Sequence, residues 1–283
     1  MEISQQDIFA LCQTFRKVSV YDFSDYSYKS LYRRVEKILT DNNITIQTLI
    51  DNISKDYNYL ESVVNQITVN TTELFRDPEI WLPLRDNIQR RFSNSQMIDI
   101  WHAGCSSGQE VYSMLILLNE LGLFDQVSSF GTDINEEVLD VAQHGRYRYV
   151  DINEYLPNFN TVINHGREKE EYIPISKYIS SNQQRDYIQV APWLVDKPVF
   201  IKHDLVSCTT FLDRKFDIII CRNVLIYFNH DLQNKIIDFF YNCLKDNGML
   251  IIGRQESIYG NHTEGFEKSG GIYFKRNRRN LYF

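Results

Sequence analysis

The chain has 283 residues, a formal net charge of −7 and 43% hydrophobic residues. This length allows one large domain or two modest ones, and the apolar fraction is sufficient for a sizeable core. The negative charge argues against a nucleic-acid-binding protein, and no apolar run approaches the ~20 residues that span a bilayer. Five scattered cysteines without a C-x-x-C motif predict reduced thiols, and the histidines show no metal-ligand spacing. We therefore expect a cytoplasmic, monomeric protein that binds no metal or nucleic acid and does not insert into membranes; the N-terminus shows no signal pattern.

Residues 1–67 are predicted to be an all-helical domain. Four segments carry apolar residues at three-to-four spacing and contain no glycine or proline. Helices this short need one another's apolar faces to be stable, so we expect a small bundle. Residues 68–95, which contain two prolines and end polar, are predicted to be a linker that contributes to the active site.

Strands and helices are predicted to alternate in residues 96–283. Expected helices span 108–122, 135–145 and 230–248, the last closed by Gly248. Expected strands span 96–104, 127–134, 198–205, 216–223 and 248–255, followed by a hairpin at 265–276. Apolar strands that alternate with helices predict a mostly parallel α/β sheet covered on both faces, with an antiparallel C-terminal edge. Residues 146–197 are tyrosine-rich and irregular, which predicts an inserted subdomain or lid, and the basic and aromatic residues 274–283 are expected to be a disordered tail.

Four predicted strands end at residues that would share one edge of the sheet, namely Gly104, Asp133, Asp204 and Asn223. Ligands of open α/β sheets bind at this edge, and glycine lets a ligand approach the backbone. A carboxylate at position 133 suits a ribose diol. The alternatives are a tight turn at Gly104 and, for Asp133, the N-cap of the following helix.

A nucleoside cofactor fits this edge, and both NAD and S-adenosylmethionine satisfy the pattern. The segment "GCSSGQ" at 104–109 lacks the G-x-G-x-x-G fingerprint, which disfavours NAD. Glu110, just inside the next helix, would repel a pyrophosphate but could pair with the amino group of a methionine moiety.

Five segments in order resemble one protein family: "NTTELFRDPEIW" (70–81), "WHAGCSSGQEVYS" (101–113), "GTDI" (131–134), "FDIIICRNVLIYFN" (216–229) and "GMLIIGRQES" (248–257). Together they are similar to the bacterial chemotaxis receptor glutamate methyltransferases, the CheR family, over nearly the whole chain. The resemblance implies a seven-stranded class I S-adenosylmethionine-dependent methyltransferase fold. It also implies esterification of glutamate side chains on the cytoplasmic helices of chemoreceptors, with S-adenosylhomocysteine as product.

The resemblance also implies roles for individual residues. Arg76 and Tyr227 match the family residues near the point of methyl transfer. The positions implied to bind the cofactor are Asn70, Thr72, Arg76, Glu110, Asp133, Asp204, Leu205, Arg222 and Asn223, beside Gly104 from the strand-end pattern. The sequence departs from the family at Gln109, Asp204 and Gln255. In some members the insertion docks a receptor tail through a glycine-containing turn, whereas the insertion here has a lone Gly166.

Methyl transfer to glutamate needs positioning more than acid–base catalysis, because a carboxyl group with an unperturbed pKa of ~4.3 is already ionised at neutral pH. Arg76 could orient the acceptor carboxylate or bind the cofactor's own carboxylate; the alternative is a salt bridge with Asp77 or Glu73. Tyr227 could point its hydroxyl at the reacting centre, and the alternative is a packing aromatic.

A basic helix face is predicted in the N-terminal domain. Lys29, Arg33 and Lys37 recur every four residues, with Arg34 beside them. Arg33, Arg34 and Lys37 are the candidates for docking glutamate-rich receptor helices, and an ordinary solvated face is the alternative. Two rival functions remain at this point: an NAD-dependent oxidoreductase and an inactive cofactor-binding module that contacts signalling partners.

Overall fold

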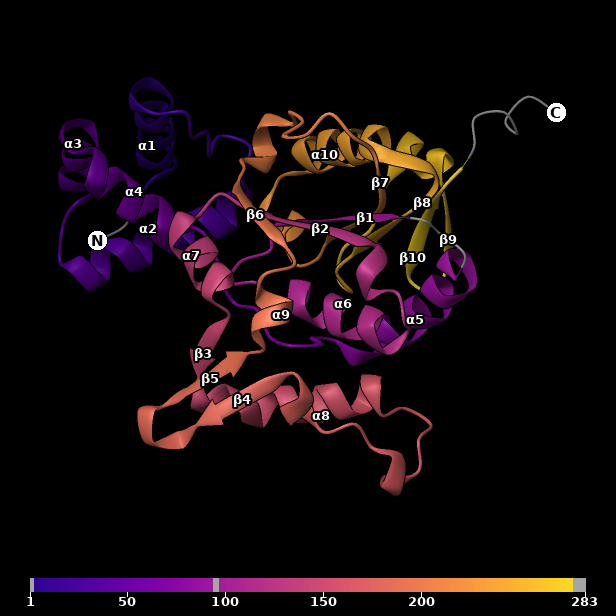
Figure 1. Ribbon diagram of the computed structural model, residues 1–283. Coiled ribbons are helices and arrows are strands. Elements are labelled where there is room, and N and C mark those ends of the chain that lie inside the picture. Colours follow the sequence, from indigo (N-terminus) through magenta and orange to yellow (C-terminus); the bar gives the residue numbers. More distant parts are fainter. Residues whose placement is uncertain (1–2, 94–96, 277–283) are drawn as a thin grey trace.

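A seven-stranded sheet forms the centre of the molecule (Figure 1) in the computed structural model, which describes residues 3–93 and 97–276. The strand order is β6-β2-β1-β7-β8-β10-β9. β6, β2, β1, β7 and β8 are parallel, and β10 pairs antiparallel with both β8 and β9. The predicted mostly parallel sheet with an antiparallel C-terminal edge is confirmed. The strands are β1 (Ile98–Ala103), β2 (Val127–Asp133), β6 (Val199–Lys202), β7 (Phe216–Cys221), β8 (Leu244–Ile252), β9 (Phe266–Ser269) and β10 (Ile272–Lys275).

Helices cover both faces of this sheet because its central strands are apolar on both sides. In β7, Ile218 and Ile220 face one buried cluster, while Ile219 and Cys221 face another. Helix α10 (His230–Cys243) packs on the second cluster, and α6 (Gln109–Glu120) packs on the first. Helix α7 (Glu136–His144) follows β2.

Residues 5–67 form four helices with a hydrophobic cluster of their own, which includes Phe15, Val35, Leu49 and Val63. Three of the helices begin at side chains that cap backbone N–H groups: Ser4, Thr45 and Asp56. The helices lie beside β6 and α7 in Figure 1. They are α1 (Gln5–Val18), α2 (Tyr28–Asn42), α3 (Ile46–Lys55) and α4 (Tyr57–Ile67).

Half of the segment predicted as a linker is a helix, α5 (Pro78–Phe92). Trp81, Leu84 and Ile88 on α5 are buried in the same cluster as α6. The prolines favoured an irregular linker in the sequence analysis. Pro78 instead occupies the first turn of the helix, where a missing N–H is harmless. Only residues 68–77 connect α4 to α5 without regular structure.

The insertion is more regular than its sequence indicates. It contains α8 (Ile152–Ile163), α9 (Pro192–Val195) and a three-stranded antiparallel sheet in the order β3-β5-β4. Its tyrosines are partly core residues, since Tyr155 and Tyr178 are buried beside Phe159. The strands have only three or four residues, too few to show a period: β3 (Arg146–Arg148), β4 (Ile179–Asn182) and β5 (Tyr187–Val190).

The predicted end of the last long helix, Gly248, is wrong. Helix α10 ends at Cys243, and β8 begins at Leu244, which pairs with Phe216 of β7. The Lys245 ammonium lies 2.8 Å from Asp99 and 2.7 Å from Asp217, so tertiary ion pairs hold the start of this strand. The final hairpin is present, and its strand β10 takes up residues 274 and 275 of the expected tail; residues 277–283 lie outside the described chain. None of the described helices has the length and apolarity that crossing a membrane requires.

Candidate functional site

A cleft lies at the carboxyl ends of β1, β2, β6 and β7, where ligands of open α/β sheets bind. The residues after these strands line it, together with the connection between α4 and α5. The structure therefore brings together both predicted catalytic residues and every predicted cofactor position. These are Asn70, Thr72, Arg76, Gly104, Glu110, Asp133, Asp204, Leu205, Arg222, Asn223 and Tyr227.

Gly104 starts the sharp turn after β1. Its φ is +73°, a region that other residues rarely adopt, and a Cβ atom there would lie 2.5 Å from Val224 Cγ2. The turn therefore requires glycine for its conformation and for its approach to the loop after β7.

Asp133 is buried at the end of β2, with 9% of its surface exposed. One carboxylate oxygen accepts the Ser106 N–H at 2.8 Å and the other accepts the Asn135 N–H at 3.0 Å. Burial raises the pKa of Asp133, although these backbone hydrogen bonds act to lower it. The N-cap of α7 is Asn135 rather than Asp133, so the helix-cap alternative is wrong.

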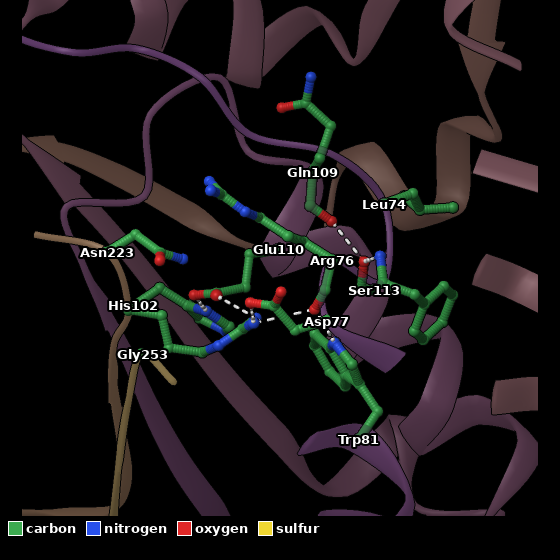
Figure 2. Close-up of polar contacts among 12 residues, drawn as sticks. Leu74, Arg76, Asp77, Trp81, His102, Gln109, Glu110, Ser113, Asn223 and Gly253 are labelled. Carbon is green, nitrogen blue, oxygen red and sulfur yellow. Dashed lines mark hydrogen bonds and ion pairs between the residues drawn. The ribbon is translucent and has the colours of Figure 1, made fainter. Parts of the chain in front are cut away.

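An ionic cluster around the buried Arg222 side chain joins three segments in the wall of the cleft (Figure 2). The Arg222 guanidinium donates to Glu110 at 3.1 Å and to Asp77 at 2.6 Å, and its side chain is 2% exposed. Glu110 also contacts His102 Nδ1 at 3.3 Å. Burial alone would raise the pKa of Glu110, but His102 and Arg222 lower it, which keeps this carboxylate ionised. The Arg222 side chain therefore fixes Glu110 relative to the connection that carries Arg76.

The Arg76 backbone is held in place while its side chain extends away from this cluster (Figure 2). The Arg76 carbonyl accepts from Trp81 Nε1 at 3.0 Å and from Arg222 Nη2 at 2.9 Å. Its neighbours Phe75 and Asp77 have positive φ angles of 52° and 53°. Within residues 3–93 and 97–276, the guanidinium makes one hydrogen bond, to Thr71 O at 3.2 Å, and no salt bridge, so the expected alternative of a bridge to Asp77 or Glu73 is wrong.

Tyr227 lies in a short turn after β7 and is half-buried. Burial raises the pKa of its hydroxyl, whereas the charges of Arg34 and Arg76 lower it. Tyr227 is therefore within electrostatic reach of cations from two other segments, Arg34 on helix α2 and Arg76 on the connection before α5. Its ring also packs against the α10 side of the core, so the packing alternative describes part of its role.

Glu256 is a site residue that the sequence interpretation missed. It is 7% exposed, and its carboxylate accepts four backbone N–H groups, from Gly253, Asn223, Val224 and Ile226. Burial raises its pKa against the lowering effect of these hydrogen bonds. Glu256 thus organises the loop that carries Asn223 and Tyr227. The signal in the sequence was an acidic residue shortly after the apolar strand β8, in the segment that resembles the family.

The residues of the predicted basic face differ in how far they are exposed. Lys29, Arg33 and Lys37 are exposed on α2, whereas Arg34 is partly buried and its charge lowers the pKa of Tyr227. Lys37 forms an ion pair with Asp41 at 2.6 Å, which offsets part of its charge. Arg33 therefore presents the less compensated charge of the two exposed candidates.

The cleft suits a ligand with a nucleoside end and a charged end. Buried Asp133 and half-buried Asp204 lie beside apolar Leu205, which matches the hydroxyls and the flat face of a nucleoside. Arg76 and Glu110 supply one cation and one anion for an amino-acid group.

Comparison with known proteins gives a family match over most of the chain. The family described as CheR methyltransferase, SAM binding domain, matches residues 70–274. A Pseudomonas putida protein provisionally named methyltransferase Cher3 is 32% identical over 87% of both chains. The chemotaxis protein methyltransferase of Listeria monocytogenes is 26% identical over 89% of this chain and 90% of its own length. That of Escherichia coli is 27% identical over 83% of this chain and 77% of its own length.

Proposed function

The chain belongs to the CheR methyltransferase family, and we propose that it methylates glutamate side chains of chemoreceptor cytoplasmic helices, forming methyl esters for sensory adaptation. Its fold is the class I S-adenosylmethionine-dependent methyltransferase fold, with S-adenosylmethionine as the cofactor. The observation that carries the proposal is the cleft, where the Arg76 guanidinium has no carboxylate partner among the described residues and lies near Tyr227. We propose that the enzyme acts as a cytoplasmic monomer.

The residues that would hold the cofactor follow from the chemistry of the cleft. Asp133 and Asp204 would accept hydrogen bonds from the nucleoside, next to Leu205. Asn70 and Thr72 line the same cleft, with Glu110 available to an ammonium group. When bound, S-adenosylmethionine supplies a methyl group on a positively charged sulfur, which a carboxylate oxygen can accept.

The acceptor glutamate needs orientation, and Arg76 and Tyr227 are placed to provide it. The guanidinium of Arg76 can hold the acceptor carboxylate by charge and hydrogen bonds. The Tyr227 hydroxyl, which remains protonated at neutral pH, can donate to the same group. Neither residue removes a proton, because the acceptor is already ionised.

Receptor docking is proposed for the exposed side of α2. Arg33 and Lys37 would attract acidic receptor helices, while Arg34 would act closer to the cleft. Such rim charges accelerate encounter and select partners more than they add affinity.

The test is methyl transfer to cognate receptors in enriched membranes. Labelled methyl groups should become protein-bound and be released as methanol by mild base, since carboxyl methyl esters are base-labile. Tyr227→Phe should lower the rate and leave the melting temperature unchanged, because the described structure gives its hydroxyl no hydrogen-bond partner. The absence of base-labile label with a cognate receptor would identify an inactive module instead. Stabilisation by NADH rather than S-adenosylhomocysteine in a thermal-shift assay would instead identify an oxidoreductase.

A further inference from the structure

A tyrosine from the N-terminal helical segment lines the cofactor cleft. Tyr26, between α1 and α2, borders the same cavity as Asp133, Asp204 and Leu205. It lies outside residues 70–274, which the family match covers. The helical segment therefore contributes a polar side chain to a cleft that is otherwise built mostly by the sheet.

The backbone around Tyr26 is fixed to the loop that carries Tyr227. Tyr26 forms an antiparallel bridge with Phe228, and the Ser27 N–H donates to Tyr227 O at 2.8 Å. The Asn229 N–H donates to Asp25 O at 2.9 Å. These backbone hydrogen bonds therefore fix the position of Tyr26 relative to the loop that carries Tyr227.

The Tyr26 ring is also held from two sides. It packs edge-on against Phe23, with ring centroids 4.9 Å apart, and against Phe228 at 5.0 Å. Burial raises the pKa of its hydroxyl, as do the negative charges of Asp204 and Asp133, so the group is a hydrogen-bond donor at neutral pH. The Tyr26 side chain is half-buried at the cleft, and within the described residues its hydroxyl makes no hydrogen bond, so it is available to a ligand.

We propose that Tyr26 is a cofactor-binding residue whose hydroxyl donates a hydrogen bond to the nucleoside end of the cofactor, beside Asp133 and Asp204. This inference rests on the proposed function and extends it, because it gives the helical domain a role in cofactor affinity as well as in receptor docking. Cofactor binding would then connect the two parts of the chain through the Tyr26–Phe228 bridge.

Calorimetric titration with S-adenosylhomocysteine tests the proposal without a receptor. Tyr26→Phe keeps the ring contacts and removes only the hydroxyl, so its Kd should rise about threefold to tenfold while its melting temperature stays at the wild-type value. Tyr59→Phe is the matched control, since Tyr59 is partly buried in the same helical core and does not line the cleft. Its Kd should equal that of the wild type.

A second ligand, 5′-methylthioadenosine, locates the contact, because it keeps the nucleoside and lacks the amino-acid end. Tyr26→Phe should weaken its binding by the same factor. Equal Kd values for Tyr26→Phe and Tyr59→Phe would overturn the inference and leave the proposed function intact. The same holds if Tyr26→Phe loses affinity for S-adenosylhomocysteine but not for 5′-methylthioadenosine. A wild-type protein that binds neither ligand would overturn the proposed function itself, and the inference with it.

Discussion

Glu256→Gln should impair catalysis more than stability, because the Glu256 carboxylate organises the loop after β7. One oxygen accepts Val224 and Ile226 N–H groups at 3.0 and 3.2 Å, and the other accepts Asn223 N–H at 3.1 Å and Gly253 N–H. Glutamine keeps one such oxygen and turns an NH₂ group toward the other two donors. The site is too tight for that group to move away, since a Cβ at Gly253 would lie 2.7 Å from Glu256 Oε2.

Two buried donors without an acceptor cost about 1–3 kcal/mol each, and removing a buried charge offsets part of this loss. We expect the free energy of unfolding to fall by roughly 2 kcal/mol, or about 4 °C in Tm for a chain of this size. Methyl transfer should fall about 100-fold at a temperature where the variant is folded, because a shift of ~1 Å in Tyr227 or Asn223 is sufficient for such a loss.

The assay compares Glu256→Gln with Glu267→Gln, an exposed carboxylate on β9. Labelled methyl transfer, the Kd for S-adenosylhomocysteine and thermal melting are measured for both. If Glu256→Gln matches Glu267→Gln in rate and Tm, the carboxylate does not organise this loop and the reasoning fails.

Three further predictions concern the cleft and the basic face. Arg76→Ala should lower methyl transfer about 100-fold or more with little change in Tm, since its guanidinium makes one hydrogen bond among the described residues; a wild-type rate, judged against exposed Arg90→Ala, would remove Arg76 from the site. Asp133→Asn should weaken S-adenosylhomocysteine binding about tenfold at neutral pH. Because burial raises the pKa of Asp133 above 3.8, wild-type affinity should be full above that raised pKa and fall as the pH drops through it. Titrations should show this dependence reduced in Asp133→Asn, where Asp204, whose pKa burial also raises, still contributes. Arg33→Gln should raise the KM for receptor about threefold at low salt, and Lys37→Gln should raise it less because Asp41 already pairs with Lys37; equal effects would contradict this distinction.

The sheet could be predicted from the sequence because its signals are local. Runs such as residues 216–221 are apolar on both faces, and a polar or glycine residue ends each run. The parallel order then places the residues after these strands at one edge, which is why Asp133 and Asn223 were expected to meet. The position of the cleft could be predicted because alternating strands and helices imply a parallel sheet. In a parallel sheet the carboxyl ends of all strands lie at the same edge.

The helix ends and the insertion could not be predicted because distant contacts decide them. Residues 244–247 continue the helical pattern of α10, yet Leu244 pairs with Phe216 and Lys245 contacts Asp99. The short strands of the insertion are likewise specified by their neighbours, with Tyr178 buried against Phe159. Tyr26 gave no signal at all, because its position in the cleft depends on the bridge to Phe228, about 200 residues away.

Tertiary contacts also determine the backbone conformation of the segments that carry Arg76 and Tyr227. Phe75, Asp77 and Asn223 all have positive φ angles, at a cost of about 1–3 kcal/mol each for residues other than glycine. Each is held by a partner from another segment: Ser113 Oγ accepts the Phe75 N–H at 2.8 Å, Arg222 pairs with Asp77, and Glu256 accepts the Asn223 N–H. Local preference opposes this conformation most strongly at Phe75, because Asp and Asn tolerate positive φ better than other residues do. The packed sheet and its helices are therefore needed to hold Arg76 and Tyr227 at the cleft. The positions of these two residues are therefore a consequence of the whole fold, and substitutions at Ser113 or Glu256, neither of which was expected in the site, should disturb the geometry around Arg76 and Tyr227.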